Sequence, residues 1–184
     1  MDLVLASSSP RRAELLKAAG FHFSIAPIAV DETALPSEAP QDHVRRLARD
    51  KTLAAAAGAP GATILGADTV VVVDDAILGK PNDARDARRM LRLLAGRRHH
   101  VYTGVALWRL GAVREAVEVS AVDFSAMSHD EIDWYVASGE PLGKAGAYAI
   151  QGLASRFVTR LEGSYTNVVG LPVAVVYRLL ESQH

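Results

Sequence analysis

The residues with the clearest chemical potential lie close to the N-terminus, in the stretch LASSSPRRAELL. Apolar residues 2–6 predict a buried strand, and the serine and proline that follow predict the first turn of a helix. The N-terminus of a helix carries unpaired N–H groups and a partial positive charge. Ser7, Arg11 and Arg12 add hydroxyl and guanidinium donors at this turn, and such donors suit a phosphate group. The alternative is a capped helix whose arginines are solvated or paired with a neighbouring acid.

A second candidate is Asp68, which stands in the motif GADT. The surrounding pattern predicts a strand, a break at GAD and then a hairpin that turns at Asp74 and Asp75. Ligands of open α/β sheets bind at the carboxyl ends of the strands, where an aspartate can hold Mg²⁺ or take a proton from water. The alternative interpretation of Asp68 is an ordinary turn residue.

Three further charged residues stand alone in the sequence. Glu32 in VDET either completes a metal site with Asp68 or is a solvated loop acid. Lys51 lies on a predicted helix with several charges, so a solvated helix face is its simpler interpretation. Lys80 stands between a glycine and a proline, in a rigid turn that would display its side chain. With the two arginines, these residues supply two carboxylates and four cations, a set that suits a nucleoside phosphate and a divalent ion.

The composition limits the classes of protein that the chain can represent. Its 184 residues are 49% hydrophobic, which is enough for one substantial core or a single bilobed domain. A net charge of −1 gives no general support for nucleic-acid binding. The absence of cysteine excludes disulfides, thiolate metal sites and a thiol nucleophile, and it fits a cytoplasmic protein. No stretch resembles a signal peptide or is long enough to span a bilayer, so the sequence predicts a soluble protein without a membrane partner.

Hydrophobic periodicity and turn residues predict alternating strands and helices, with antiparallel hairpins in the second half. This pattern favours an α/β fold with a mixed, twisted sheet and flanking helices over a purely parallel sheet. Helices are predicted at residues 10–19, 41–57, 82–95 and 129–138 and after Pro172, and long strands at 99–110 and 112–124. His99 and His100 are adjacent in one of these strands, so their rings point to opposite faces and cannot chelate one metal ion.

Six motifs occur in order between about Leu3 and Pro172: LASSSPRRAELL, VDE, LGADTVV, LGKP, KAGAYAIQG and GSYTNVVGLP. Together they resemble the Maf family of nucleoside triphosphate pyrophosphatases. The resemblance implies a two-lobed α/β fold similar to the inosine-triphosphate pyrophosphatases, formed by residues 1–184 as a single domain with the active-site cleft between its lobes. It also implies hydrolysis of a nucleoside triphosphate to the monophosphate and pyrophosphate with a divalent cation, Mg²⁺ before Mn²⁺. A homodimer and a link to septum formation are further expectations from the family.

The resemblance also assigns roles residue by residue. Asp68 matches the family's proposed proton acceptor, and together with Glu32 it would hold the metal ion. Gln151 matches a residue near the base. The positions that match residues handling phosphate or substrate are Ser7, Arg11, Arg12, Lys51 and Lys80.

Three of the matched positions distinguish substrate branches of the family. Arg11, Thr69 and Gln151 resemble the branch acting on dTTP and UTP. The branch acting on 7-methyl-GTP tends to have an aromatic residue, SDQ and a glutamate at these places. A neutral glutamine offers both a donor and an acceptor to a uracil or thymine edge, whereas a carboxylate suits the donor-rich edge of guanine. The segments TNVVGLP and VYTGVAL resemble the 7-methyl-GTP branch more closely, but they do not include any of the three distinguishing positions.

The predicted function is therefore hydrolysis of dTTP and UTP, with Asp68 orienting or deprotonating the water that attacks the α-phosphorus. Three alternatives stay open: a 7-methyl-GTP pyrophosphatase of the same family, a house-cleaning pyrophosphatase for modified nucleotides, and a non-catalytic septation regulator that acts through a protein partner. Only an enzyme needs Asp68 and a divalent ion to make product. A measurement of nucleotide turnover therefore distinguishes the regulator from the pyrophosphatases.

Overall fold

The computed structural model describes residues 2–181, and the chain divides into two compact units. The first unit comprises Met1–Asp68, Thr103–Glu118 and Gly170–His184, and the second comprises Thr69–Tyr102 and Val119–Val169. The boundary after Asp68 falls inside a strand, so the chain passes from one unit to the next without a linker.

The strands form a mixed sheet. They are β1 (Leu3–Leu5), β2 (Ser24–Ile25), β3 (Thr63–Val73), β4 (Ala76–Leu78), β5 (Arg98–Arg109), β6 (Ala112–Phe124) and β7 (Val158–Glu162). Within residues 2–181 the strand order is β2-β1-β3-β5-β6-β7, with β4 paired to β3. β1 pairs in parallel with β2 and β3, whereas the pairs β3–β4 and β6–β7 are antiparallel. The predicted α/β fold class is confirmed.

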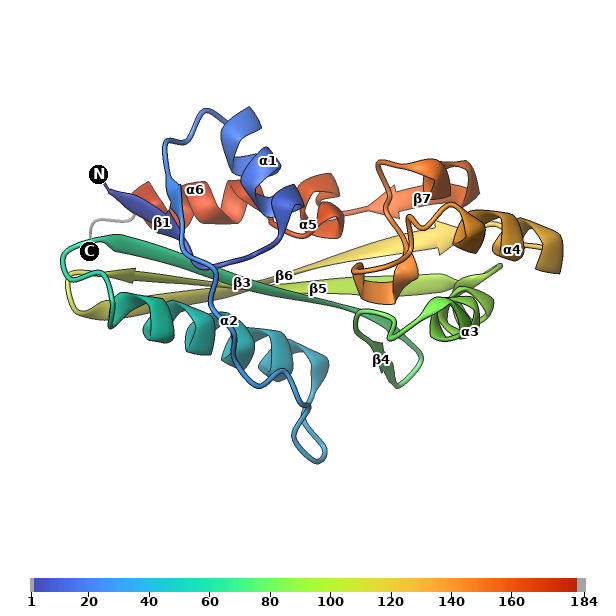
Figure 1. The fold of residues 1–184 in the computed structure, drawn as a ribbon, viewed down its shortest axis with the longest axis horizontal. Coiled ribbons are helices and arrows are strands. Elements are labelled where there is room, and N and C mark those ends of the chain that lie inside the picture. The colour runs from blue at the N-terminus through green and yellow to red at the C-terminus, as the bar shows by residue number, and fades with distance from the viewer. Residues whose placement is uncertain (1, 182–184) are drawn as a thin grey trace. The chain divides into compact units, whose positions relative to one another are not determined.

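Three helices cover the strands of the first unit: α1 (Pro10–Ala18), α2 (Pro40–Ala56) and α6 (Val173–Glu181). Figure 1 shows α1 and α6 on one face of these strands and α2 on the other. Alternate side chains of a strand point to opposite faces. Leu3 and Leu5 therefore pack in one cluster with Leu16 of α1 and Val176 of α6, while Val4 packs in another with Ala55 of α2. The period-2 pattern of β1 thus places a helix on each side of it.

The backbone of helix α2 packs directly against the backbones of β3 and β5, and a glycine in each strand makes this close contact possible. A Cβ atom on Gly104 would lie 2.2 Å from the carbonyl oxygen of Val44, and one on Gly66 would lie 2.6 Å from that of Ala48. Gly66 belongs to the GAD segment, where a break in the strand was predicted. That prediction is wrong, because β3 runs through GAD without interruption and the glycine serves the helix contact instead of a turn. Asp68 consequently lies inside a strand, not at its carboxyl end.

The second unit contains α3 (Ala84–Leu94), α4 (His129–Ala137), α5 (Tyr165–Val169) and the short 3₁₀ helices η1 (Ala145–Ala147) and η2 (Leu153–Phe157). The predicted capping box is confirmed, since the Ser128 side chain accepts the N–H of Glu131 and the Glu131 carboxylate accepts that of Ser128. The side chain of Asp83 caps α3 in the same way by accepting the N–H of Asp86. These caps satisfy N–H groups that the first turn of a helix leaves unpaired.

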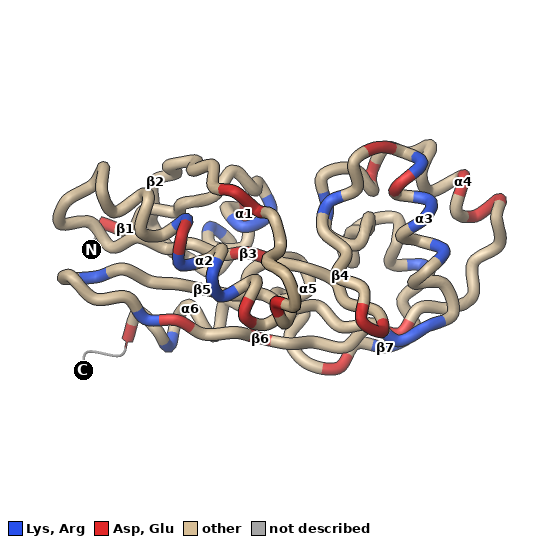
Figure 2. Tube along the Cα trace, turned by 90° about the horizontal axis from the view of Figure 1, so that it is seen from below, with Lys and Arg blue, Asp and Glu red and all other residues tan. Residues whose placement is uncertain are grey.

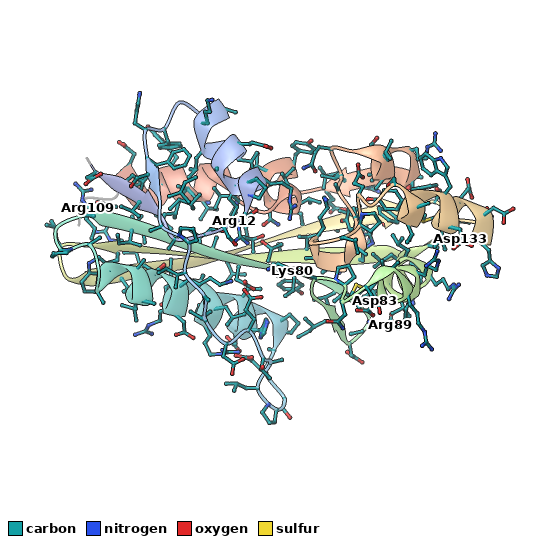
Figure 3. All side chains as sticks on the ribbon, viewed as in Figure 1. Arg12, Lys80, Asp83, Arg89, Arg109 and Asp133 are labelled. Atoms are coloured by element: carbon teal, nitrogen blue, oxygen red, sulfur yellow. The ribbon has the colours of Figure 1, made fainter. Side chains whose placement is uncertain are left out.

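Helix α3 carries four arginines and one aspartate, and Figure 2 shows the basic residues along it. Its N-cap Asp83 and its Arg89 are labelled in Figure 3. Among residues 2–181, no helix combines the length and apolar character needed to cross a membrane.

His99 lies in an aromatic cluster of the second unit. Its side chain is fully buried, and its Nε2 lies 2.9 Å from the hydroxyl of Tyr148. Its ring meets those of Phe124 and Tyr148 edge-on, with centroids 4.9 and 5.4 Å away. The next residue, His100, is exposed, which confirms that the two rings take opposite faces. Burial lowers the pKa of His99 from 6.5 to about 4, against smaller opposing effects of the Arg97 backbone and the Asp123 carboxylate.

Acidification is expected to destabilise the protein through His99. Below pH 6.5 the unfolded chain takes up a proton at this position, whereas the folded chain does so only near the lowered pKa of about 4. The free energy of unfolding therefore falls as the pH falls through this window, by up to about 1.4 kcal/mol per pH unit. Urea unfolding from about pH 7 to about pH 5 should show a shallower pH slope in His99→Gln than in the wild type. Equal slopes in the two proteins would contradict the prediction.

Candidate active site

Three charged side chains of the first unit meet in one ion-pair network. Lys51 Nζ lies 2.6 Å from Glu32 Oε1 and 2.7 Å from Asp68 Oδ1. Lys51 and Asp68 are buried, whereas the Glu32 side chain is 46% exposed. An ammonium that donates to two carboxylates fixes their separation and orientation. The structure therefore brings together three of the predicted site residues, from a loop, α2 and β3.

Lys51 is buried because of its place in the period of α2. The buried residues of this helix recur every three or four positions, as an amphipathic helix requires. They are His43, Val44, Leu47, Ala48, Lys51, Thr52 and Ala55. The interpretation of Lys51 as part of a solvated helix face is therefore wrong. Its spacing of four residues from both Leu47 and Ala55 is the sequence signal that points to the buried face.

The two adjacent arginines of α1 lie in different environments. Arg12 is buried, and its Nε donates to the carbonyl of Gly170 at 2.9 Å. Its Nη1 donates to Ser7 Oγ at 3.0 Å and to the carbonyl of Ala67 at 2.8 Å. In Figure 3, Arg12 reaches from α1 toward the strands of the first unit. Arg11 is only half-buried. Arg12 thus ties together the backbone around the site, and Arg11 is the arginine that is more exposed to a ligand.

Ser7 lies where β1 ends and the turn into α1 begins. Its Oγ is buried and accepts the N–H of Ser9 at 3.2 Å in addition to the arginine. The N–H of Ala6 donates to the carbonyl of Leu65 at 2.8 Å, which extends the parallel pairing of β1 and β3 toward Asp68. The carboxyl end of β1, not that of β3, therefore lies beside the candidate base.

The charges of this site influence one another. Burial lowers the pKa of Arg12 below its ordinary value, the carboxylates of Asp68 and Glu32 oppose that shift, and the positive charge of Arg11 adds to it. A guanidinium keeps its proton in proteins at ordinary pH. The first unit thus holds buried positive charge next to two carboxylates, an arrangement that can attract an anion and accept a proton from a water molecule beside it.

The loop that carries Glu32 is held by an ion pair that the sequence did not reveal. On α2, Arg46 donates from Nε to Glu38 Oε1 at 2.6 Å and from Nη2 to Oε2 at 2.8 Å. Its Nη2 also donates to the carbonyl of Thr33 at 3.1 Å. The hydrogen bonds from Arg46 hold the pKa of Glu38 well below its ordinary value of 4.5. Because Thr33 directly follows Glu32, Arg46 restrains the backbone next to a site residue.

The remaining predicted residues belong to the second unit. Thr69 is half-buried in β3, Lys80 is exposed in the turn after β4 (Figure 3), and Gln151 is exposed in a turn before η2. The N–H of Gly146 donates to the carbonyl of Gly79 at 3.0 Å. The motifs LGKP and KAGAYAIQG therefore lie side by side, although they are far apart in the sequence.

Comparison with known sequences identifies the family. Residues 2–183 match the sequence model of the family described as Maf-like protein. The chain belongs to the Maf-like family. Among the relatives of this Maf-like chain, the dTTP/UTP pyrophosphatase of Anaeromyxobacter dehalogenans (strain 2CP-C) is 52% identical over 182 residues, covering 97% of this chain and 92% of that protein. The dTTP/UTP pyrophosphatase of Geobacter sp. (strain M21) is 54% identical over 178 residues, covering 95% and 92%. The family predicted from the ordered motifs is confirmed.

Solved structures share the fold of this Maf-like chain at low sequence identity. The Ham1 protein of Staphylococcus aureus aligns with a TM-score of 0.56 at 13% identity and covers 100% of both chains. A HAM1 protein from Coxiella burnetii aligns with a TM-score of 0.55 at 15% identity, over 99% of this chain and 100% of that one. At this identity the likeness concerns the fold alone.

Proposed function

We propose that this chain is a nucleoside triphosphate pyrophosphatase that hydrolyses dTTP and UTP to the nucleoside monophosphate and pyrophosphate. The observation that carries the proposal is the buried pairing of Asp68 with Lys51, joined by Glu32, beside the turn that begins at Ser7. The relatives named dTTP/UTP pyrophosphatases, which match half of this chain's residues over nearly its whole length, support the choice of reaction and of bases.

Asp68 is the proton acceptor in the proposed reaction. Lys51 holds its Oδ1, which leaves Oδ2 as the oxygen that faces the attacking water. The water oxygen bonds to the α-phosphorus, and the water proton passes to the Asp68 carboxylate. The bond between the α-phosphorus and the oxygen that bridges to the β-phosphorus breaks, and pyrophosphate leaves with that oxygen. The Lys51 ammonium keeps the base oriented between turnovers.

The residues of this site fit a divalent cation. Glu32 and Asp68 lie close together, because each places one carboxylate oxygen against the Lys51 ammonium, at 2.6 and 2.7 Å. Mg²⁺ is commonly bound by one or two carboxylates together with substrate phosphates, and Mn²⁺ accepts the same oxygen ligands. When bound by these two residues, the ion would offset the negative charge of the triphosphate. Residues 2–181 contain no cluster of three or more His, Asp or Glu side chains arranged for a metal.

The triphosphate is proposed to lie over the turn that begins at Ser7. Arg11, Lys51 and Lys80 would balance its charge, and Arg12 would do so while it holds the turn. Lys80 belongs to the second unit. The single two-lobed domain with its active-site cleft stays a prediction.

The base is proposed to be selected by Gln151, with contributions from Arg11 and Thr69. The amide of Gln151 can donate to a carbonyl of uracil or thymine and accept from the ring N–H next to it. The exposure of Gln151 leaves its amide accessible to a base. Homodimer formation and a cytoplasmic location also stay predictions.

The proposal is tested by measuring pyrophosphate release from UTP, dTTP, CTP, 7-methyl-GTP and ITP with Mg²⁺. We expect turnover of UTP and dTTP above the other nucleotides, with loss of turnover when EDTA removes the metal. Turnover mainly of 7-methyl-GTP would overturn the assignment of the bases while keeping the reaction. No pyrophosphate from any nucleotide would overturn the reaction itself and favour a regulator that acts through a protein partner.

A further inference from the structure

The turn that carries Gln151 is held from both sides by one pair of side chains. The hydroxyl of Tyr135, on α4, accepts the N–H of Ala149 at 3.1 Å and donates to Glu140 Oε1 at 2.8 Å. Glu140 Oε2 in turn accepts the N–H of Leu153 at 3.0 Å. The two anchored N–H groups lie two residues before and two residues after Gln151. A single chain of hydrogen bonds therefore closes around this residue.

Gln151 itself lies in a tight turn within this frame. The N–H of Gly152 donates to the carbonyl of Ala149 at 3.0 Å, which makes Gln151 the third residue of a four-residue turn. A Cβ atom on Gly152 would lie 2.2 Å from Glu140 Oε2, so the carboxylate packs directly against the backbone after Gln151. The φ angle of Gly152 is −106°, outside the left-handed region, so a side chain here would chiefly displace the Glu140 carboxylate.

The surroundings keep this arrangement rigid. Tyr135 is fully buried, and Ala149 and Ala154 on the two sides of the turn are buried as well. Burial, together with the hydrogen bond to Glu140, raises the pKa of Tyr135 above its ordinary value of 10, so the hydroxyl stays a donor at neutral pH. The N–H of Ala154 adds a longer hydrogen bond of 3.4 Å to Glu140 Oε1. The hydrogen bond from Ala149 to Tyr135 is buried and costly to leave unmade, whereas the one from Leu153 to Glu140 is exposed, so the turn is held most firmly on the side before Gln151.

A fixed turn matters for base selection because a glutamine amide carries both a hydrogen-bond donor and an acceptor, which can exchange places. Rotating the amide by half a turn exchanges its donor and its acceptor, so a loosely held glutamine can match uracil or cytosine equally well. Discrimination requires that the side chain start from one backbone position and reach the base in one pose.

From these contacts we infer that Tyr135 and Glu140 are positioning residues for base selection: they hold the turn so that the Gln151 side chain reaches uracil or thymine from one backbone position. This inference rests on the proposed function, in which Gln151 contacts the base. Neither residue touches the nucleotide in this scheme. Their effect should appear in the choice between nucleotides and not in the chemical step.

The test compares kcat/KM for UTP and for CTP in Tyr135→Phe, Glu140→Gln and the double variant. Tyr135→Phe keeps the ring and removes only the hydroxyl, so it serves as the milder variant if Glu140→Gln folds poorly. We expect the ratio of kcat/KM for UTP over CTP to fall about tenfold in each single variant, the effect of one misplaced hydrogen bond. The double variant should fall no further than the singles, because both residues belong to one chain of hydrogen bonds.

Two controls separate positioning from general loss of stability. Glu131→Gln weakens the capping box of the same helix α4, away from the turn, so it should lower the melting temperature and leave the UTP/CTP ratio unchanged. Tyr165→Phe removes the hydroxyl of an exposed tyrosine of the second unit and should change neither quantity. Amide hydrogen exchange at Gly152 and Leu153 should accelerate in Tyr135→Phe and Glu140→Gln, but not in Glu131→Gln.

Gln151→Ala distinguishes failure of this inference from failure of the proposed function. If Gln151→Ala lowers the UTP/CTP ratio while Tyr135→Phe and Glu140→Gln keep the wild-type ratio, the positioning role is overturned and the proposed function stands. If Gln151→Ala keeps the wild-type ratio, or the wild type does not release pyrophosphate from UTP, the assignment of Gln151 and the inference that rests on it are overturned together.

Discussion

Replacing Asp68 with asparagine is expected to lower kcat for UTP by about 10²–10⁴-fold, the usual contribution of a positioned general base. The KM for UTP should change much less, because asparagine keeps the size of the side chain and can still accept a hydrogen bond from Lys51 through its amide oxygen. What the variant loses is the ability to take a proton from water. The measurement is steady-state pyrophosphate release with saturating Mg²⁺, compared with wild-type protein of equal folded fraction.

A matched control for this variant is Asp75→Asn. Asp75 is an exposed aspartate in the turn between β3 and β4, so the same chemical change occurs outside the proposed site. It should leave kcat and KM at wild-type values. An Asp68→Asn protein that turns over UTP at close to the wild-type rate would remove Asp68 from the role of base. A loss confined to KM would instead assign it to substrate or metal binding.

The elements of the fold were largely predictable from local patterns, and the exception is instructive. The apolar run at residues 3–6 and the three-to-four-residue period of the helices are local signals of single elements, and the strand and helices that they predict are confirmed. Gly66 was interpreted as a break because glycine commonly ends or bends a strand. Its actual role is to admit the backbone of α2, whose residue Ala48 is 18 positions earlier in the sequence. No local pattern distinguishes a glycine that ends a strand from one that a distant helix requires.

The site was predictable as a set of residue types but not as a set of contacts. Asp68, Lys51 and Glu32 were identified one by one, and only the fold shows that the lysine joins the two acids. Adjacent arginines looked equivalent in the sequence, whereas the structure buries Arg12 among backbone carbonyls and leaves Arg11 half-buried. The hydrogen-bonded pair around Gln151 was missed altogether. Glu140 meets the N–H of a residue 13 positions away, and nothing in its immediate sequence indicates that contact.

Replacing Lys51 with methionine is expected to destabilise the protein by about 3 kcal/mol, because removing one partner of a buried ion pair leaves an uncompensated charge. Methionine approximates the length and volume of the lysine stem, so packing in α2 changes little. Most of the loss should come from Asp68, whose side chain is 10% exposed, since water screens the 46%-exposed Glu32 far more effectively. Urea unfolding gives the free energy, and Lys17→Met on the exposed side of α1 is the control that should stay within about 0.5 kcal/mol of the wild type.

The double variant Lys51→Met/Asp68→Asn decides whether the loss is electrostatic. If the buried carboxylate is what the lysine stabilises, neutralising Asp68 in the Lys51→Met background removes the unpaired charge, and the double variant should be more stable than Lys51→Met alone. If the lysine contributes only through packing, the two losses should add and the double variant should be the least stable of the set. The first result would also mean that the ion pair that orients the proposed base contributes to the stability of the fold. In that case stability and catalysis at this site depend on a single buried ammonium.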